Sequence, residues 1–211
     1  TPKGEEAYMV DQAKVMYKEL SPETDAFFGI MTGQELMDLT TKPGKANGGY
    51  MTFLDDYKVP FIFSNFNGTS GDVDVLTHEA GHAFQGWLQR DVELKDIADI
   101  TSEVAEIHSM SMEYLTWPWM DRFFKEDTAK FKYAHLADAL KFLPYGVSVD
   151  HFQHEVYAHP EYSPKERKDA WRRLEKMYTP HKDYSENAFY DQGTFWFTQS
   201  HVFANPFYYI D

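Results

Sequence analysis

The sequence predicts a mainly α-helical fold with a small β-hairpin. Apolar residues recur at helical spacing, as in residues 3–19. Ser21-Pro22-Glu23 is a typical helix start, with a capping serine, proline at the first helical position and an acidic first turn. Strand character appears at residues 50–54 and 59–64, which Asp55-Asp56 separates as a turn. We expect these elements to form one domain over residues 1–211.

The remaining helices are expected at residues 22–33, 72–88, 101–113, 128–157 and 163–177. Thr69, Ser70 and Asp72 offer N-terminal caps for the second of these. The segment from Pro144 to Gly146 should interrupt the long helix, because proline lacks the backbone N–H that an unbroken helix needs. The acidic connection at 91–100 is expected to be solvated.

Two histidines lie one helical turn apart in the segment H-E-A-G-H, residues His78 to His82. At a spacing of four residues both imidazoles share one face of a helix, so they can reach a single ion. Glu79 lies beside that ion, where its carboxylate can take a proton from an activated water. The alternative is a helix whose two histidines are spaced this way by accident.

A third protein ligand is needed, because zinc in a hydrolase usually keeps three protein ligands and one open position. Leu88 stands six residues after the second histidine and excludes a third histidine there. The predicted helix at 101–113 offers Glu103, Glu106 and Glu113. Glu106 and Glu113 share a face, and Glu103 lies one turn earlier. For each glutamate the alternative is a solvated acidic face.

Composition excludes several classes of partner and site. The net charge of −14 disfavours nucleic acid and anionic membranes as partners, since both are themselves negative. The chain has no cysteine, so any metal must be held by histidine and carboxylate. The 17% share of aromatic residues suggests a broad core or an aromatic-lined groove. We see no signal peptide and no apolar run of membrane-spanning length, and we expect a cytoplasmic protein.

Several segments together resemble one enzyme family. They are H-E-A-G-H-A-F-Q from His78, E-I-H-S-M-S-M-E from Glu106, K-A-N-G-G-Y at 45–50, P-F-I-F-S-N-F at 60–66 and H-V-F-A-N-P-F-Y-Y-I-D at 201–211. With these motifs the chain resembles the M3 family of zinc oligopeptidases, in its oligoendopeptidase F branch. The resemblance implies a zincin-like (gluzincin) helical metallopeptidase catalytic domain. Members of that family are much longer, so we expect a catalytic fragment without the N-terminal lobe and C-terminal helices.

The same resemblance implies the metal ligands and the catalytic base. One Zn²⁺ ion would be held by His78, His82 and Glu106, with Glu103 as the second choice for the carboxylate. Glu79 would be the general base.

Near the end of the chain, His201 with Tyr208 or Tyr209 resembles the family's donors to the tetrahedral oxyanion. The alternative for these residues is aromatic packing in the core. The predicted hairpin would present a strand edge to an extended peptide, and glycines there permit close backbone approach. The residues expected to bind substrate are Gly48, Gly49 and Tyr50.

The resulting hypothesis is a zinc-dependent endopeptidase that cleaves short oligopeptides. Two alternatives stay open. One is a carboxypeptidase of a related helical family with the same histidine motif, and the other is a zinc-binding helical module without turnover.

The choice of the third ligand can be tested by substitution. Glu106→Ala should lower zinc affinity by orders of magnitude, because it removes one of three protein ligands. Zinc content after dialysis against a chelator measures this. If Glu103→Ala loses zinc while Glu106→Ala retains it, Glu103 is the ligand.

Overall fold

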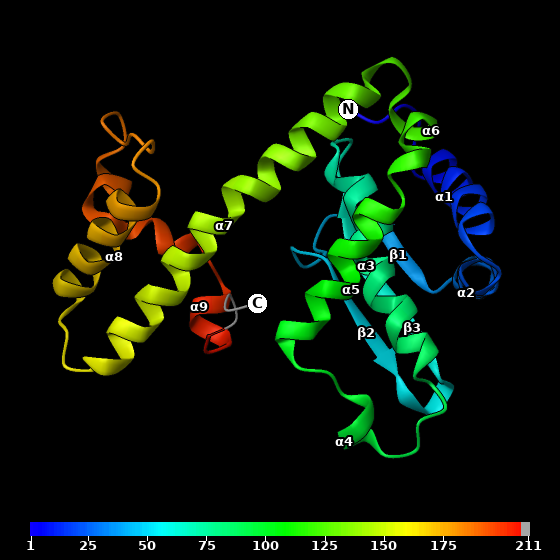
Figure 1. Ribbon diagram of the computed structural model, residues 1–211, viewed down its shortest axis with the longest axis horizontal. Coiled ribbons are helices and arrows are strands. Elements are labelled where there is room, and N and C mark those ends of the chain that lie inside the picture. The colour runs from blue at the N-terminus through cyan, green and yellow to red at the C-terminus, as the bar shows by residue number, and fades with distance from the viewer. Residues whose placement is uncertain (208–211) are drawn as a thin grey trace. The chain divides into compact units, whose positions relative to one another are not determined.

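The computed structural model describes residues 1–207, apart from the side chains at positions 102 and 103. The chain divides into two compact units, Thr1–Tyr133 and Ala134–Asp211. The predicted fold class is confirmed: the described part is mostly helical and holds one three-stranded sheet (Figure 1). A single domain over 1–211 stays a prediction. Among the described residues, no helix has both the length and the apolar character that a membrane crossing requires.

The first unit carries the sheet and most of the helices. Its α-helices are α1 (Glu6–Leu20), α2 (Pro22–Gly33), α3 (Gly71–Leu88), α4 (Lys95–Ala98), α5 (Ser102–Leu115) and α6 (Met120–Phe124). Its strands are β1 (Met37–Thr40), β2 (Tyr50–Leu54) and β3 (Val59–Phe66). Short 3₁₀ turns are η1 (Asp55–Tyr57), η2 (Trp117–Trp119) and η3 (Lys125–Asp127).

The predicted hairpin is confirmed, and the sheet has one strand more than the sequence indicated. β2 and β3 pair antiparallel, with Tyr50 opposite Phe63 and Leu54 opposite Val59. β1 pairs parallel to β3, so the strand order is β1-β3-β2. β1 has only four residues, M-D-L-T, and is defined by its pairing with β3 and not by a pattern of its own. β2 is therefore an edge strand.

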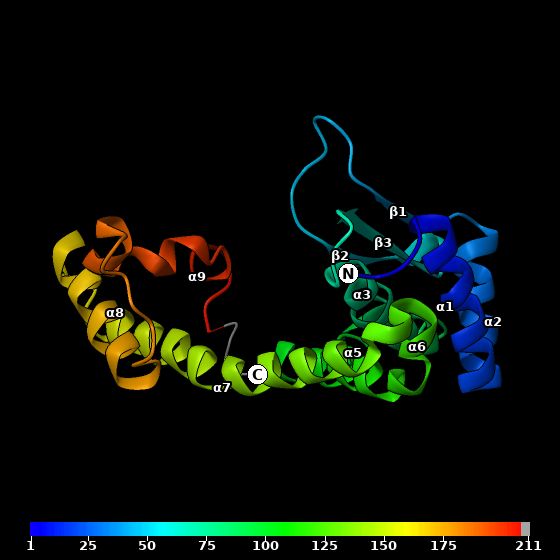
Figure 2. The same cartoon turned by 90° about the horizontal axis from the view of Figure 1, so that it is seen from above.

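Helix α3 lies between the sheet and α5 (Figures 1 and 2). Its apolar side packs into a core that α1, α2, α6 and the sheet complete. Tyr17 of α1 is fully buried, and its hydroxyl donates to the Leu76 carbonyl at 2.8 Å, which fixes α1 against α3. The start of α3 differs from the prediction, because the Ser70 side chain makes no capping bond. The buried Asp72 carboxylate instead accepts from two backbone N–H groups of the preceding loop, those of residues 67 and 68.

The contact between α3 and α5 depends on Gly81. A Cβ atom at this position would lie 2.7 Å from Ser109 Cα, 2.9 Å from the His108 carbonyl oxygen and 3.0 Å from Met112 Cβ. Two of these neighbours are backbone atoms, which cannot turn aside as a side chain can. Only glycine therefore allows the two helix backbones to come this close.

The long helix α7 (Thr128–Ala158) runs without a break through Pro144. The predicted interruption at Pro144–Gly146 is thus wrong. One polar contact holds the helix at this point: the buried Ser148 hydroxyl donates to the Pro144 carbonyl at 2.8 Å. The later elements are α8 (Pro164–Tyr178), η4 (Tyr190–Thr194), η5 (Phe195–Thr198) and α9 (His201–Ala204). These elements and the second half of α7 share a separate core, in which Trp171 of α8 is fully buried together with Phe152 and Trp196.

Substituting Gly81 tests the close approach of the two helices. Gly81→Ala should lower the free energy of unfolding by about 1–3 kcal/mol, because the added methyl group overlaps the α5 backbone. Gly29→Ala is the matched control, since a Cβ at helical Gly29 meets nothing within 4 Å. That control should be neutral or stabilising by up to about 1 kcal/mol. Thermal unfolding of both variants measures the difference, and equal losses would contradict the packing argument.

Candidate metal centre

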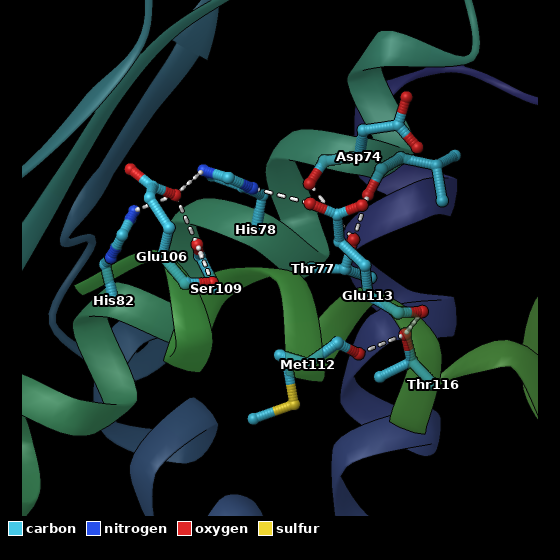
Figure 3. Close-up of polar contacts among 10 residues, drawn as sticks. Asp74, Thr77, His78, His82, Glu106, Ser109, Met112, Glu113 and Thr116 are labelled. Carbon is cyan, nitrogen blue, oxygen red and sulfur yellow. Dashed lines mark hydrogen bonds and ion pairs between the residues drawn. The ribbon is translucent and has the colours of Figure 1, made fainter. Parts of the chain in front are cut away.

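Three nitrogen and oxygen donors converge on the inner face of α3. His78 and His82 lie one turn apart, and their ring centroids are 5.0 Å apart. One donor atom from each histidine and one carboxylate oxygen of Glu106 all lie within 4.8 Å of one another (Figure 3). This is the spacing that a single ion needs. Among the described residues, it is the one group of three or more such side chains close enough to hold a metal.

Glu106 reaches the histidines from α5. Its Oε2 lies 3.2 Å from His78 Nε2 and 3.5 Å from His82 Nε2. The hydroxyl of Ser109, one turn later and fully buried, donates to the same oxygen at 2.6 Å (Figure 3). Ser109 therefore restrains the carboxylate in the position that faces the histidines. Sequence reasoning missed Ser109, although its place three residues after Glu106 could have indicated it.

Glu113 holds the other side of His78. Its Oε1 lies 2.6 Å from His78 Nδ1, on the side of the ring away from Glu106 (Figure 3). When the N–H group at Nδ1 donates a hydrogen bond to Glu113, Nε2 carries no proton. The lone pair of Nε2 is then available to a metal ion on the side of the ring that faces Glu106. Histidine ligands of metals usually have such a carboxylate partner, which fixes the ring and makes it more basic. The sequence offered Glu113 as a candidate ligand. In the structure it instead contacts the ring of the candidate ligand His78, on the side away from Glu106.

The donor set suits a divalent transition metal. Two imidazole nitrogens with one carboxylate match a catalytic zinc site, which keeps its fourth position open. Calcium and magnesium prefer oxygen donors throughout, so this set disfavours them. The Glu103 side chain, the second choice for the third ligand, lies outside the described part of the chain.

Charges at the centre are strongly coupled. Burial lowers the pKa of His78, but hydrogen bonds with Glu106 and Glu113 outweigh it and raise this pKa to about 10. Burial favours the neutral acid at Glu106, whereas its hydrogen bonds with the histidines and Ser109 hold its pKa well below the usual range. Without a metal, a protonated His78 therefore bridges two carboxylates.

Glu79 faces a different environment from the other two carboxylates. Burial raises its pKa, while the nearby His78 and His82 and a backbone hydrogen bond from Met51 act in the opposite direction. The Met51 contact ties Glu79 to the edge strand β2. Glu79 therefore lies next to the metal ligands in a partly buried position, with its pKa shifted upward by burial.

The predicted substrate-binding glycines lie beside Glu79. An open pocket of about 410 Å³ is lined by Gly48, Gly49 and Glu79, together with residues of β3 and the loop after it. Gly48 has φ +99°, a conformation that other residues rarely adopt. The exposed Tyr50 stacks on Phe63 at a centroid distance of 5.1 Å. Their role in substrate binding stays a prediction.

Of the predicted oxyanion donors, the structure describes His201, which belongs to the second unit. His201 begins the short helix α9, and its Nδ1 contacts the Gln199 side chain. Tyr208 and Tyr209 lie outside the described residues.

A helical fold with this histidine pair and a glutamate from a later helix defines a zincin-like metallopeptidase. The family model of peptidase family M3 matches residues 18–211, so the chain belongs to this family. The family is one of zinc metallopeptidases.

Solved structures agree with this assignment. A protein provisionally assigned as an oligoendopeptidase F is 57% identical, with a TM-score of 0.96, over 100% of this chain and 37% of its own length. PZ peptidase A, solved with an inhibitor, is also 57% identical with a TM-score of 0.96, over 99% of this chain and 37% of its own length. A protein from Bacillus anthracis, again provisionally assigned as an oligoendopeptidase F, is 58% identical with a TM-score of 0.83, over 92% of this chain and 35% of its own length. The chain thus spans little more than a third of the length of these relatives. No curated protein matched the sequence.

The role of Glu113 can be tested separately from that of the ligands. Glu113→Gln should weaken metal affinity about 10- to 100-fold, because the neutral amide no longer orients His78 or increases its basicity. Competition with a zinc-binding dye measures the affinity. Glu93→Gln, at an exposed glutamate of the α3–α5 connection, is the control and should bind as the wild type does. Equal affinity in both variants would remove Glu113 from this role.

Metal affinity should also depend on pH. Because the pKa of metal-free His78 is about 10, an incoming ion must displace its proton throughout the neutral range. Affinity should therefore rise about tenfold per pH unit between pH 6 and 8. The same dye competition at three pH values measures the slope. A plateau above pH 7, as an ordinary histidine would give, would contradict the charge arrangement.

Proposed function

We propose that this chain carries the catalytic centre of a zinc-dependent endopeptidase that hydrolyses short oligopeptides. The observation that carries the proposal is the convergence of His78, His82 and Glu106 within 4.8 Å, with Glu79 next to them on α3. Family membership supports peptide bonds as the substrate.

In this proposal the two histidines and Glu106 hold one Zn²⁺ ion per chain. Bound there, zinc supplies a Lewis acid and lowers the pKa of water towards neutrality. Glu113 and Ser109 keep His78 and Glu106 in place for this role. Preorganised ligands reduce the rearrangement that ion binding requires.

Glu79 moves the proton. Its carboxylate accepts a proton from the attacking water and then delivers it to the nitrogen of the leaving amine. Burial supports both steps because it raises the pKa of Glu79. The pKa of the carboxyl group then lies closer to the pKa values of the water and the amine with which it exchanges the proton. The Met51 backbone holds the carboxylate beside β2, where a peptide could lie.

Two further groups of residues complete the proposal. His201 with Tyr208 or Tyr209 would donate hydrogen bonds to the oxyanion, a role supported by resemblance to the family. The outer edge of β2 would add main-chain hydrogen bonds to an extended peptide, with Gly48, Gly49 and Tyr50 at its start. The edge position of β2 in the sheet supports this mode of binding.

The central experiment is Glu79→Gln in the full-length enzyme. Turnover of an internally quenched peptide with a blocked C-terminus should fall about 10²- to 10⁴-fold, because the amide cannot accept the proton of water. Zinc content should stay at one ion per chain, since Glu79 is not among the ligands. A variant that still cleaves the peptide removes Glu79 from this role.

The blocked peptide also tests the type of peptidase. A carboxypeptidase needs a free C-terminus and would leave this peptide intact, while wild-type cleavage that stops with chelator and returns with zinc supports the endopeptidase.

A further inference from the structure

A second pocket lies along α3, past His82 towards the end of the helix. It has a volume of about 410 Å³, and its walls come from β2, α3 and the connection between α3 and α5. The sequence indicated this acidic connection as merely solvated. In the structure it folds into α4 and then closes one side of the pocket through Ala98 and Ile100.

The register of α3 joins this pocket to the metal ligands. Gln85 and Gln89 follow His82 by three and seven residues, so all three lie on one face of the helix. At 1.5 Å per residue, Gln85 is about 4.5 Å further along the helix axis than His82. A side chain bound in the pocket would thus lie close to a peptide bond bound at the metal centre.

The edge strand supplies the facing wall. Met51 and Phe53 alternate with exposed residues and point towards α3, where a Cβ at Gly86 would lie 3.1 Å from the Phe53 ring. The backbone of Met51 bonds to Glu79, while its side chain lines the pocket. One strand residue therefore contacts the proposed base and the pocket together.

The polar groups of the pocket are largely neutralised by one another. The amide of Gln85 donates to Gln89, and Lys95 pairs with Asp55. Asp99, also in the lining, is exposed and disfavours an acidic guest. The other half of the lining is apolar and consists of Gly86 with the side chains of Met51, Phe53, Ala98 and Ile100. Because the polar groups are mostly paired with one another, these apolar side chains favour a large uncharged occupant, aromatic or long aliphatic.

We infer that this pocket is a specificity subsite, which takes a large uncharged side chain of the peptide at one position beside the scissile bond. The inference rests on the proposed endopeptidase function. The glycine-lined pocket near Glu79 has a different lining, of glycines, amides and carboxylates, so the two ends of the cleft select differently.

The test fills the pocket from its surface side. Ala98→Phe in the full-length enzyme is assayed with internally quenched peptides that carry Phe or Ala at each position around the scissile bond. For the wild type, kcat/KM should favour Phe at one position by about tenfold or more. The variant should lose this preference at that position alone, so that its kcat/KM for the Phe peptide falls to that for the Ala peptide. Ile97→Phe is the matched control, because Ile97 is 69% exposed on the same helix and does not line the pocket.

A second variant tests the same pocket through charge. Gln85→Glu should raise kcat/KM for a peptide with Lys at that position by about tenfold, with zinc content unchanged. An unaltered preference in both variants, or an equal loss for all peptides, would overturn the subsite. A wild-type enzyme that cleaves none of the peptides would instead overturn the endopeptidase proposal itself.

Discussion

The metal centre depends on how closely α3 and α5 approach. Histidines on one helix and carboxylates on another can meet only if the two backbones are nearly in contact, and Gly81 makes this possible. The glycine lies inside the histidine motif, between the two imidazoles in sequence, so the contact forms next to the donors. With a larger residue there, α5 would have to move outward and carry Glu106 and Glu113 with it.

Within that contact, opposite charges hold the donors in place. His78 lies between two carboxylates, one on each ring nitrogen, and Ser109 restrains the carboxylate that also faces His82. The same contacts that stabilise a protonated His78 leave its Nε2 directed at Glu106 once the proton is lost. The arrangement therefore stabilises the protein without a metal and gives the donors nearly the placement that an ion requires.

The cleft is built from elements that are unremarkable one by one. β2 is a short edge strand, α4 is a single helical turn, and neither would be stable alone. β2 packs against α3 through Met51 and Phe53, and α4 is tied to the hairpin by Lys95, which pairs with Asp55 and lies over the Phe53 ring. A substrate along β2 would meet the metal ligands and two unlike pockets in succession, which is how one helix could organise both chemistry and selection.

The sequence by itself determined the local features. A capping serine followed by proline predicted the helix start at Pro22, and the spacing of His78 and His82 predicted a shared face, because these are interactions between residues close in the chain. Tertiary structure alone decided the pairing of β1, the unbroken helix at Pro144, the place of Glu113 behind His78 and the pocket closed by α4. Each of these features depends on contacts between residues far apart in sequence, or on packing that overrides a local preference. The spacing of nearby residues does not predict such contacts or such packing.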